Sequence, residues 1–159
     1  MTQIDFYTHV SNKLSVACRL AAKAHAQGLR VAVMCPDAAV AQSFDRMLWT
    51  VAPLAFVPHC DASHPLAART PVVIDHEGLF NAQPPNAQLA QLPHDEVLLN
   101  LREEWPPVFS RFQRLIEIVS VDDADRACAR ARFKFYRDRG YEIRSHDLSA
   151  TQNAASAQA

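Results

Sequence analysis

The chain has 159 residues, of which 49% are hydrophobic and 21% charged, which is the composition of one folded globular domain rather than of a disordered protein. Its 16 lysines and arginines against 17 acidic residues give a formal net charge of -1, so overall charge does not argue for nucleic-acid binding. No apolar run approaches the length of a membrane-spanning helix and the N-terminus lacks a signal-peptide pattern, so we expect a cytoplasmic protein.

Three helices and six strands are predicted from the spacing of apolar residues. The strands are expected where apolar residues alternate or run together, over 3–8, 30–35, 71–75, 96–101, 115–120 and 141–144. The helices are expected to begin at Ser11 or Asn12, at Pro36 or Asp37 and at Asp122, and to end at Gly28, near Trp49 and at Gly140. We expect a loop over 78–93 and a disordered tail over 149–159, which has no large apolar residue.

The order of these elements predicts an α/β fold. The run 30–35 is continuously apolar, which is typical of a strand covered on both faces. We therefore expect one three-layer domain over 1–148, Rossmann-like, with a largely parallel or mixed central sheet. The glycines, Gly28, Gly78 and Gly140, are far apart and fit neither GxGxxG nor GxxxxGK[ST], so the fold should have no nucleotide-binding glycine loop.

The densest group of chemically reactive side chains is His59, Cys60 and Asp61 with His64. Such groups can bind zinc or activate a thiolate, but no second ligand pair such as CxxC completes a zinc site. We expect these residues in a solvent-facing loop after a strand, and a small α/β enzyme or metal-binding protein stays open as an alternative. The other histidines, His9, His25, His76, His94 and His146, are scattered and receive no functional interpretation.

The last helix is locally basic. Between positions 126 and 139 it has six cationic residues and one aspartate, so six minus one gives +5. Helical spacing puts Arg126, Arg130, Lys134 and Arg137 on one face. An inward face is predicted for Ala124, Ala127, Cys128, Ala131 and Phe135, with Phe133 beside the cations.

A solvated charged face would be the ordinary interpretation of such a stripe. However, the stripe has almost no acidic partners, and like charges at this spacing destabilise a helix, which suggests an anionic ligand. Because the rest of the chain is neutral, we favour an acidic peptide over a nucleic-acid backbone. Direct binding of single-stranded DNA remains a further alternative.

Two large aromatic residues lie at the boundaries of predicted elements. Trp49 ends the second helix, and Phe56 precedes a Pro-His turn. Core packing and the anchoring of a partner protein both fit aromatic residues in such places. The residues themselves leave the two interpretations open.

A series of short motifs, in a fixed order over 1–146, carries a family resemblance. The motifs are Asp5-Phe6-Tyr7, Gly28-x-Arg30-Val31, Leu48-Trp49, Phe56-Val57-Pro58-His59, Leu98-Leu99-Asn100-Leu101, Phe109 with Phe112, and the run from Arg130 to Arg137 followed by Gly140-Tyr141. Together they resemble the chi subunit family of bacterial DNA polymerase III, whose members are small α/β proteins without enzymatic activity.

The resemblance implies a non-catalytic adaptor in DNA replication, with no cofactor and no metal. It implies two protein partners: the psi subunit of the clamp loader, and the acidic, phenylalanine-ended C-terminal tail of single-stranded DNA-binding protein. DNA would then be reached only indirectly. By position, the tail-binding surface corresponds to Arg126, Arg130, Phe133 and Lys134, with Val119 nearby. Trp49 and Phe56 match aromatic positions that the family uses toward psi.

Overall fold

A computed structural model describes residues 1–51, 56–78 and 92–149. Within them the strands are β1 (Gln3–Val10), β2 (Val31–Met34), β3 (His59–Asp61), β4 (Val72–Asp75), β5 (Val97–Asn100), β6 (Arg114–Ser120) and β7 (Ile143–Asp147). The helices are α1 (Lys13–Ala26), α2 (Ala38–Thr50) and α3 (Asp123–Asp138), with short 3₁₀ turns at 67–69 and 109–111. No helix in this part of the chain is long and apolar enough to cross a membrane.

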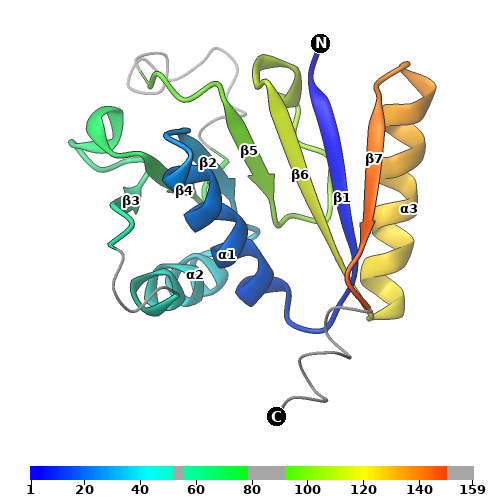
Figure 1. The fold of residues 1–159 in the computed structure, drawn as a ribbon, viewed down its shortest axis with the longest axis horizontal. Coiled ribbons are helices and arrows are strands. Elements are labelled where there is room, and N and C mark those ends of the chain that lie inside the picture. The colour runs from blue at the N-terminus through cyan, green and yellow to red at the C-terminus, as the bar shows by residue number, and fades with distance from the viewer. Residues whose placement is uncertain (52–55, 79–91, 150–159) are drawn as a thin grey trace.

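The strands form a single sheet in the order β3-β4-β2-β5-β6-β1-β7, and every pairing is parallel. Successive residues of β2 face opposite sides: Val31 and Val33 pack with α1 and α2, whereas Ala32 and Met34 belong to the core on the side of α3. Figure 1 shows α2 and α3 at opposite ends of the sheet. The predicted three-layer α/β fold is confirmed, and the continuous apolar run is explained by a strand buried on both faces.

Side-chain caps begin all three helices where the sequence predicts. Asn12, Asp37 and Asp122 each accept a hydrogen bond from the backbone N–H three residues later. At the end of α3, Gly140 has a φ of 81° and its N–H bonds the carbonyl of Arg137, which closes the helix in the left-handed geometry that glycine favours.

Two sequence predictions are wrong in detail. The segment 59–61 is strand β3 rather than a solvent-facing loop, because these three residues pair with β4 at the sheet edge. The last strand lies at Ile143–Asp147 rather than 141–144, because the Tyr141 N–H still bonds the carbonyl of Tyr136 in α3. The predicted loop at 78–93 and tail at 149–159 fall almost wholly outside the described residues.

The buried face of α3 also differs from the prediction. It consists of Ala129, Arg132 and Tyr136, whereas the predicted inward residues Ala124, Ala127 and Ala131 are exposed, and Cys128 and Phe135 are only partly buried. The difference arises because the side chain of Arg132 points inward, where it has a partner in the sheet. Burial of the small alanine side chains would contribute little by comparison. The basic residues Arg126, Arg130, Lys134 and Arg137 are exposed, as predicted.

The partner of Arg132 is Glu117, a fully buried carboxylate in the middle of β6. Arg132 Nε lies 2.9 Å from Glu117 Oε2, and the Tyr136 hydroxyl donates to Glu117 Oε1 at 2.8 Å. Asn100 Nδ2 donates to the same oxygen at 2.9 Å, and Arg132 Nη1 donates to the carbonyl of Glu103 at 2.8 Å. Burial raises the pKa of Glu117, while Arg132 and the hydrogen-bond donors oppose this rise. This network joins α3 to β5, β6 and the segment after β5.

A second buried carboxylate, Asp5 in β1, connects that strand to both of its neighbours. Arg114 Nε of β6 donates to Asp5 Oδ2 at 2.7 Å, and His146 Nε2 of β7 lies 2.9 Å from Asp5 Oδ1. Burial by itself raises the pKa of Asp5, but the hydrogen bonds from His146 and Arg114 outweigh it and hold the pKa below its usual value.

Replacing Arg132 by Met should destabilise the protein strongly, because it leaves the Glu117 carboxylate buried without its cation. Breaking one partner of a buried ion pair costs about 3 to 5 kcal/mol of unfolding free energy. Urea denaturation measures this loss. The matched control is Arg130→Met on the exposed face of the same helix, where a change within about 0.5 kcal/mol is expected. Equal effects of the two substitutions would contradict the structural role given to Glu117.

Replacing Asp5 by Asn should cost about 1 to 3 kcal/mol near neutral pH, because two partners lose a charged acceptor. Since folding lowers the pKa of Asp5, its contribution to stability is present above the unfolded-state pKa of about 3.9 and is lost as pH falls through the folded-state pKa. The stability difference between wild type and Asp5→Asn should therefore shrink in strong acid. Denaturant titrations over a pH series measure it, and a constant difference would argue against an ionised Asp5.

Candidate functional site

A pocket of about 290 Å³ opens between β1, the end of β6 and the first half of α3. Because β1 and β6 are parallel, their carboxyl ends lie together, and Figure 1 shows both beside the start of α3. The volume lies just below the range of ligand pockets, which measure roughly 300 to 1,000 Å³. Such a pocket suits one side chain or a similarly small group rather than a cofactor.

The inner wall of the pocket is apolar. Phe6 of β1 and Val119 of β6 are 2% and 6% exposed and belong to the same core cluster. Phe133 of α3 is half-buried and meets Phe6 edge to face, with ring centroids 5.4 Å apart. Two phenyl rings and a branched aliphatic side chain therefore offer an apolar surface to a ligand.

The rim of the pocket is cationic. Arg126 and Arg130, one helical turn apart on α3, line the pocket and are exposed. Arg126 has a loose contact of 3.9 Å with the exposed Asp123, whereas no ion pair joins Arg130 or Lys134 to another residue that the structure describes. Lys134 is exposed on the same helix but does not line the pocket.

A further acid of α3, Asp125, does not cancel this charge. Asp125 accepts a hydrogen bond from the Ser120 N–H at 2.8 Å and pairs with Lys13 at 3.1 Å. Burial raises the pKa of Asp125, but the Ser120 N–H and Lys13 outweigh burial and lower it. Asp125 is thus ionised and already neutralised by Lys13. The arginines of the rim keep their charge for a ligand.

The structure brings together four of the five residues that the sequence assigned to one binding surface, namely Val119, Arg126, Arg130 and Phe133, and it leaves Lys134 just outside the pocket. Sequence reasoning missed five lining residues, among them Phe6 and His9. The alternation of β1 could have placed Phe6 on the face of α3. Nothing in the sequence indicated His9.

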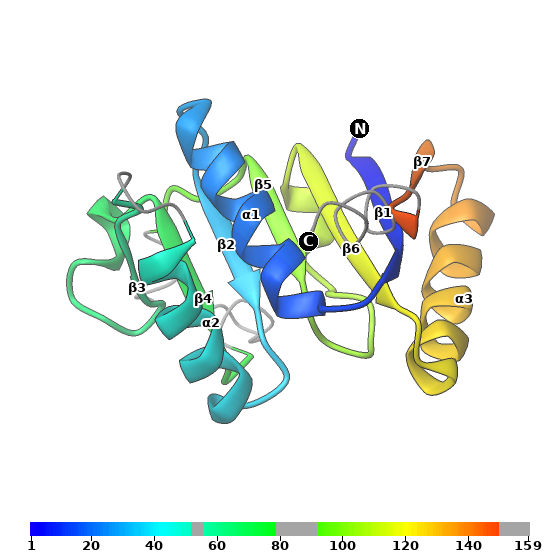
Figure 2. The ribbon, with the colours of Figure 1, turned by 60° about the horizontal axis from the view of Figure 1, so that its bottom comes forward.

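Trp49 and Phe56 form a second surface, at the opposite end of the molecule. Their side chains are 56% and 62% exposed, and their ring centroids lie 5.1 Å apart. His59 meets Trp49 edge to face at 4.8 Å, and its Nε2 lies 3.1 Å from Asp45 of α2. Figure 2 shows that α2, which carries Trp49, is well separated from α3. These two aromatic residues are therefore not core residues.

The group His59, Cys60 and His64 does not form a metal or nucleophile site in the structure. The His59 side chain is 1% exposed, and His64 Nδ1 accepts a hydrogen bond from the Leu66 N–H at 3.0 Å. Burial raises the pKa of the Cys60 thiol, which is the opposite of what an activated thiolate requires. No group of three or more His, Cys, Asp or Glu side chains is placed to hold a metal ion within 1–51, 56–78 and 92–149.

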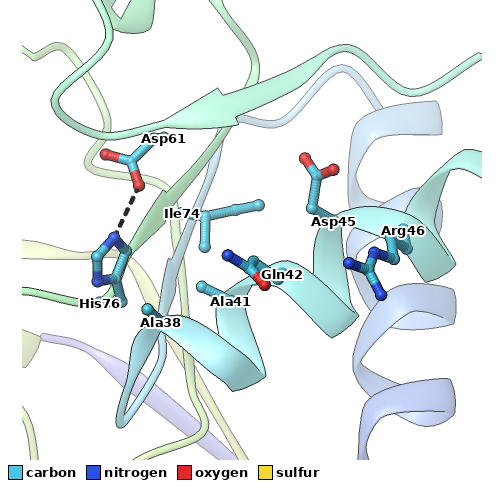
Figure 3. Close-up of a pocket in the computed structure, with 8 residues that line it drawn as sticks. All are labelled: Ala38, Ala41, Gln42, Asp45, Arg46, Asp61, Ile74 and His76. Carbon is cyan, nitrogen blue, oxygen red and sulfur yellow. Dashed lines mark ion pairs between the residues drawn. The ribbon is translucent and has the colours of Figure 1, made fainter.

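A further hollow of about 280 Å³ lies between α2 and the ends of β3 and β4 (Figure 3). Its polar lining includes His76, whose Nε2 lies 3.2 Å from Asp61 Oδ2. Gln42, Asp45 and Arg46 line it from α2. The acids and bases are mixed, and the aliphatic lining is small. The hollow has neither the apolar wall nor the single sign of charge that distinguishes the pocket at α3.

Comparisons with known proteins agree on one family. Residues 1–144 match the family model described as "DNA polymerase III chi subunit, HolC". The protein named DNA polymerase III subunit chi in Pseudomonas aeruginosa is 38% identical over 93% of this chain and 98% of its own length. Those of Haemophilus influenzae and Escherichia coli are 31% and 28% identical, over 84% and 80% of this chain and 85% and 80% of their own lengths.

Proposed function

This chain belongs to the DNA polymerase III chi subunit family, and on that premise we propose that it is a non-catalytic adaptor of the replicase. It binds the acidic C-terminal tail of single-stranded DNA-binding protein at α3, and it binds the clamp loader, through psi, at Trp49 and Phe56. The observation that carries this proposal is the pocket between β1, β6 and α3, which combines an apolar inner wall with two exposed arginines, of which Arg130 has no ion pair among the described residues and Arg126 only a loose 3.9 Å contact with Asp123.

The pocket suits a peptide that ends in an aromatic residue and carries carboxylates. The terminal ring would pack against Phe6, Val119 and Phe133, which already meet as an apolar surface. A guanidinium can hold a terminal carboxylate through two parallel hydrogen bonds, and Arg130 is the pocket arginine without a described ion pair. Arg126 and Lys134 would then face the aspartates that precede the ring.

An adaptor needs two surfaces that can be occupied together. The pocket lies at α3, and the exposed pair Trp49 and Phe56 lies at the end of α2, at the other end of the sheet. Adjacent exposed aromatic side chains are frequent anchors of protein interfaces. Because the two surfaces share no residue, binding at one leaves the other free.

The basic face of α3 supports a peptide ligand better than a DNA strand. Arg132 is buried against Glu117, so one of the six cations between positions 126 and 139 is not available to any ligand. Of the other cations, Arg126 and Arg130 line a small apolar pocket rather than an extended groove with several exposed aromatic platforms. The proposed adaptor unit is the domain of residues 1–148.

Replacing Arg130 by Ala should weaken binding of a peptide that copies the tail of the host's single-stranded DNA-binding protein. Loss of a paired carboxylate contact costs roughly 1.5 to 3 kcal/mol, which corresponds to about a tenfold or larger rise in Kd. Fluorescence anisotropy with a labelled peptide measures this. Arg137→Ala is the matched control, because Arg137 is an exposed arginine of the same helix outside the pocket.

Failure of the wild-type protein to bind the peptide would remove the centre of the proposal. Equal weakening by Arg130→Ala and Arg137→Ala would instead indicate diffuse electrostatic attraction without a defined site. Repeating the titration at higher salt separates these cases further, because a desolvated paired contact is screened less than scattered surface charge.

Replacing Trp49 by Ala should weaken binding of psi by about 2 kcal/mol or more, the effect typical of an aromatic anchor at an interface centre. The same variant should bind the tail peptide with unchanged affinity, because Trp49 lies outside the α3 pocket. Calorimetry with purified psi and with the peptide measures both. Parallel loss of both affinities would point to general misfolding, and intact psi binding would exclude this surface.

A further inference from the structure

His9 lies at an irregularity in β1, beside the α3 pocket. Tyr7 pairs with Ile118 of β6, but the next pairing joins Val10 to Ser120, so β1 has one residue more than β6 in this interval. His9 has a φ of 58°, the left-handed region, and it is the one described non-glycine residue with a positive φ. Such bulges redirect a side chain, and strain of this kind often accompanies a functional site.

The bulge brings the His9 side chain to the pocket that also includes Arg126 and Arg130. About half of the side chain, 49%, is exposed. His9 Nδ1 lies 3.2 Å from Asp147 Oδ1 of β7 and 3.2 Å from Thr8 Oγ1, whereas its Nε2 has no hydrogen-bond partner among the described residues. An imidazole held in this way has one nitrogen engaged and the other free for a ligand.

The charged groups around His9 come from β7, α3 and α1. Asp147 of β7 is an exposed carboxylate, and hydrogen bonds from Ser149 lower its pKa, so it is ionised at neutral pH. The helix α3 contributes Arg126 and Arg130, which line the same pocket as His9. Asp125 of α3 and Lys13 of α1 are paired with each other at 3.1 Å, and the exposed Asp123 of α3 lies 3.9 Å from Arg126.

We infer that His9 is a further binding residue of the α3 pocket, whose protonated Nε2–H donates to a carboxylate of the acidic ligand beside Arg126 and Arg130. With Nδ1–H directed at Asp147, neutral His9 presents a lone pair at Nε2, which repels a carboxylate; protonation from solvent turns this atom into a cationic donor. Binding of the acidic peptide is therefore coupled to uptake of one proton. The inference rests on the proposed tail-binding function and adds a pH dependence to it.

The experiment measures the Kd of an N-acetylated tail peptide for the full chain between about pH 8 and pH 6, the range in which an imidazole titrates. The peptide carboxylates titrate at about pH 4 and stay charged throughout. For a half-exposed charge the affinity of wild type should rise by about two- to fivefold over this range. His9→Asn should abolish the rise, because asparagine tolerates the left-handed conformation of the bulge but has no titratable charge.

His25→Gln on α1, which does not line the pocket, is the matched control and should keep the wild-type pH profile. A His9→Asn variant with an unaltered profile would overturn the inference while leaving tail binding intact. No binding by wild type at any pH would instead overturn the proposed function itself. As a check that needs no variant, the His9 imidazole signals followed by NMR should change when the peptide is added at about pH 6, and unchanged signals would also contradict the inference.

Discussion

The position of α3 depends on one buried ion pair, Glu117 with Arg132. A carboxylate in the middle of a buried strand requires a cation and further donors, and Arg132, Tyr136 and Asn100 supply them at 2.8 to 2.9 Å. Two of these partners belong to α3, so the network determines which side of the helix faces the sheet. As a consequence, the other arginines and Phe133 lie on the part of the helix surface that stays exposed or partly exposed.

This rotation of α3 produces the candidate site. With Arg132 and Tyr136 turned inward, Arg126 and Arg130 lie at the open edge between the helix and the carboxyl ends of β1 and β6. The parallel sheet supplies the rest, because Phe6 and Val119 reach this edge from neighbouring strands. The aromatic pair at the end of α2 depends on neither the rotation of α3 nor these two strands, so the molecule carries two separate surfaces.

The fold was largely predictable, since the buried strand 31–34 and the capping residues Asn12, Asp37 and Asp122 are local signals. Strand β3 was not, because three residues have too little periodicity to be recognised before they pair with β4. The inner face of α3 was assigned wrongly because periodicity alone places arginine outside and alanine inside. Arg132 has the reverse location for a reason that lies in another element, Glu117.

The sequence by itself determined the α/β class, the cationic character of α3 and the family motifs, because each is a property of neighbouring residues or of their spacing. Only the tertiary structure decided which cations are available to a ligand, since the buried location of Arg132 depends on β6. It also decided that His9 joins the pocket. A one-residue bulge changes the direction of a side chain, and it arises from the pairing of two strands more than a hundred residues apart in the chain.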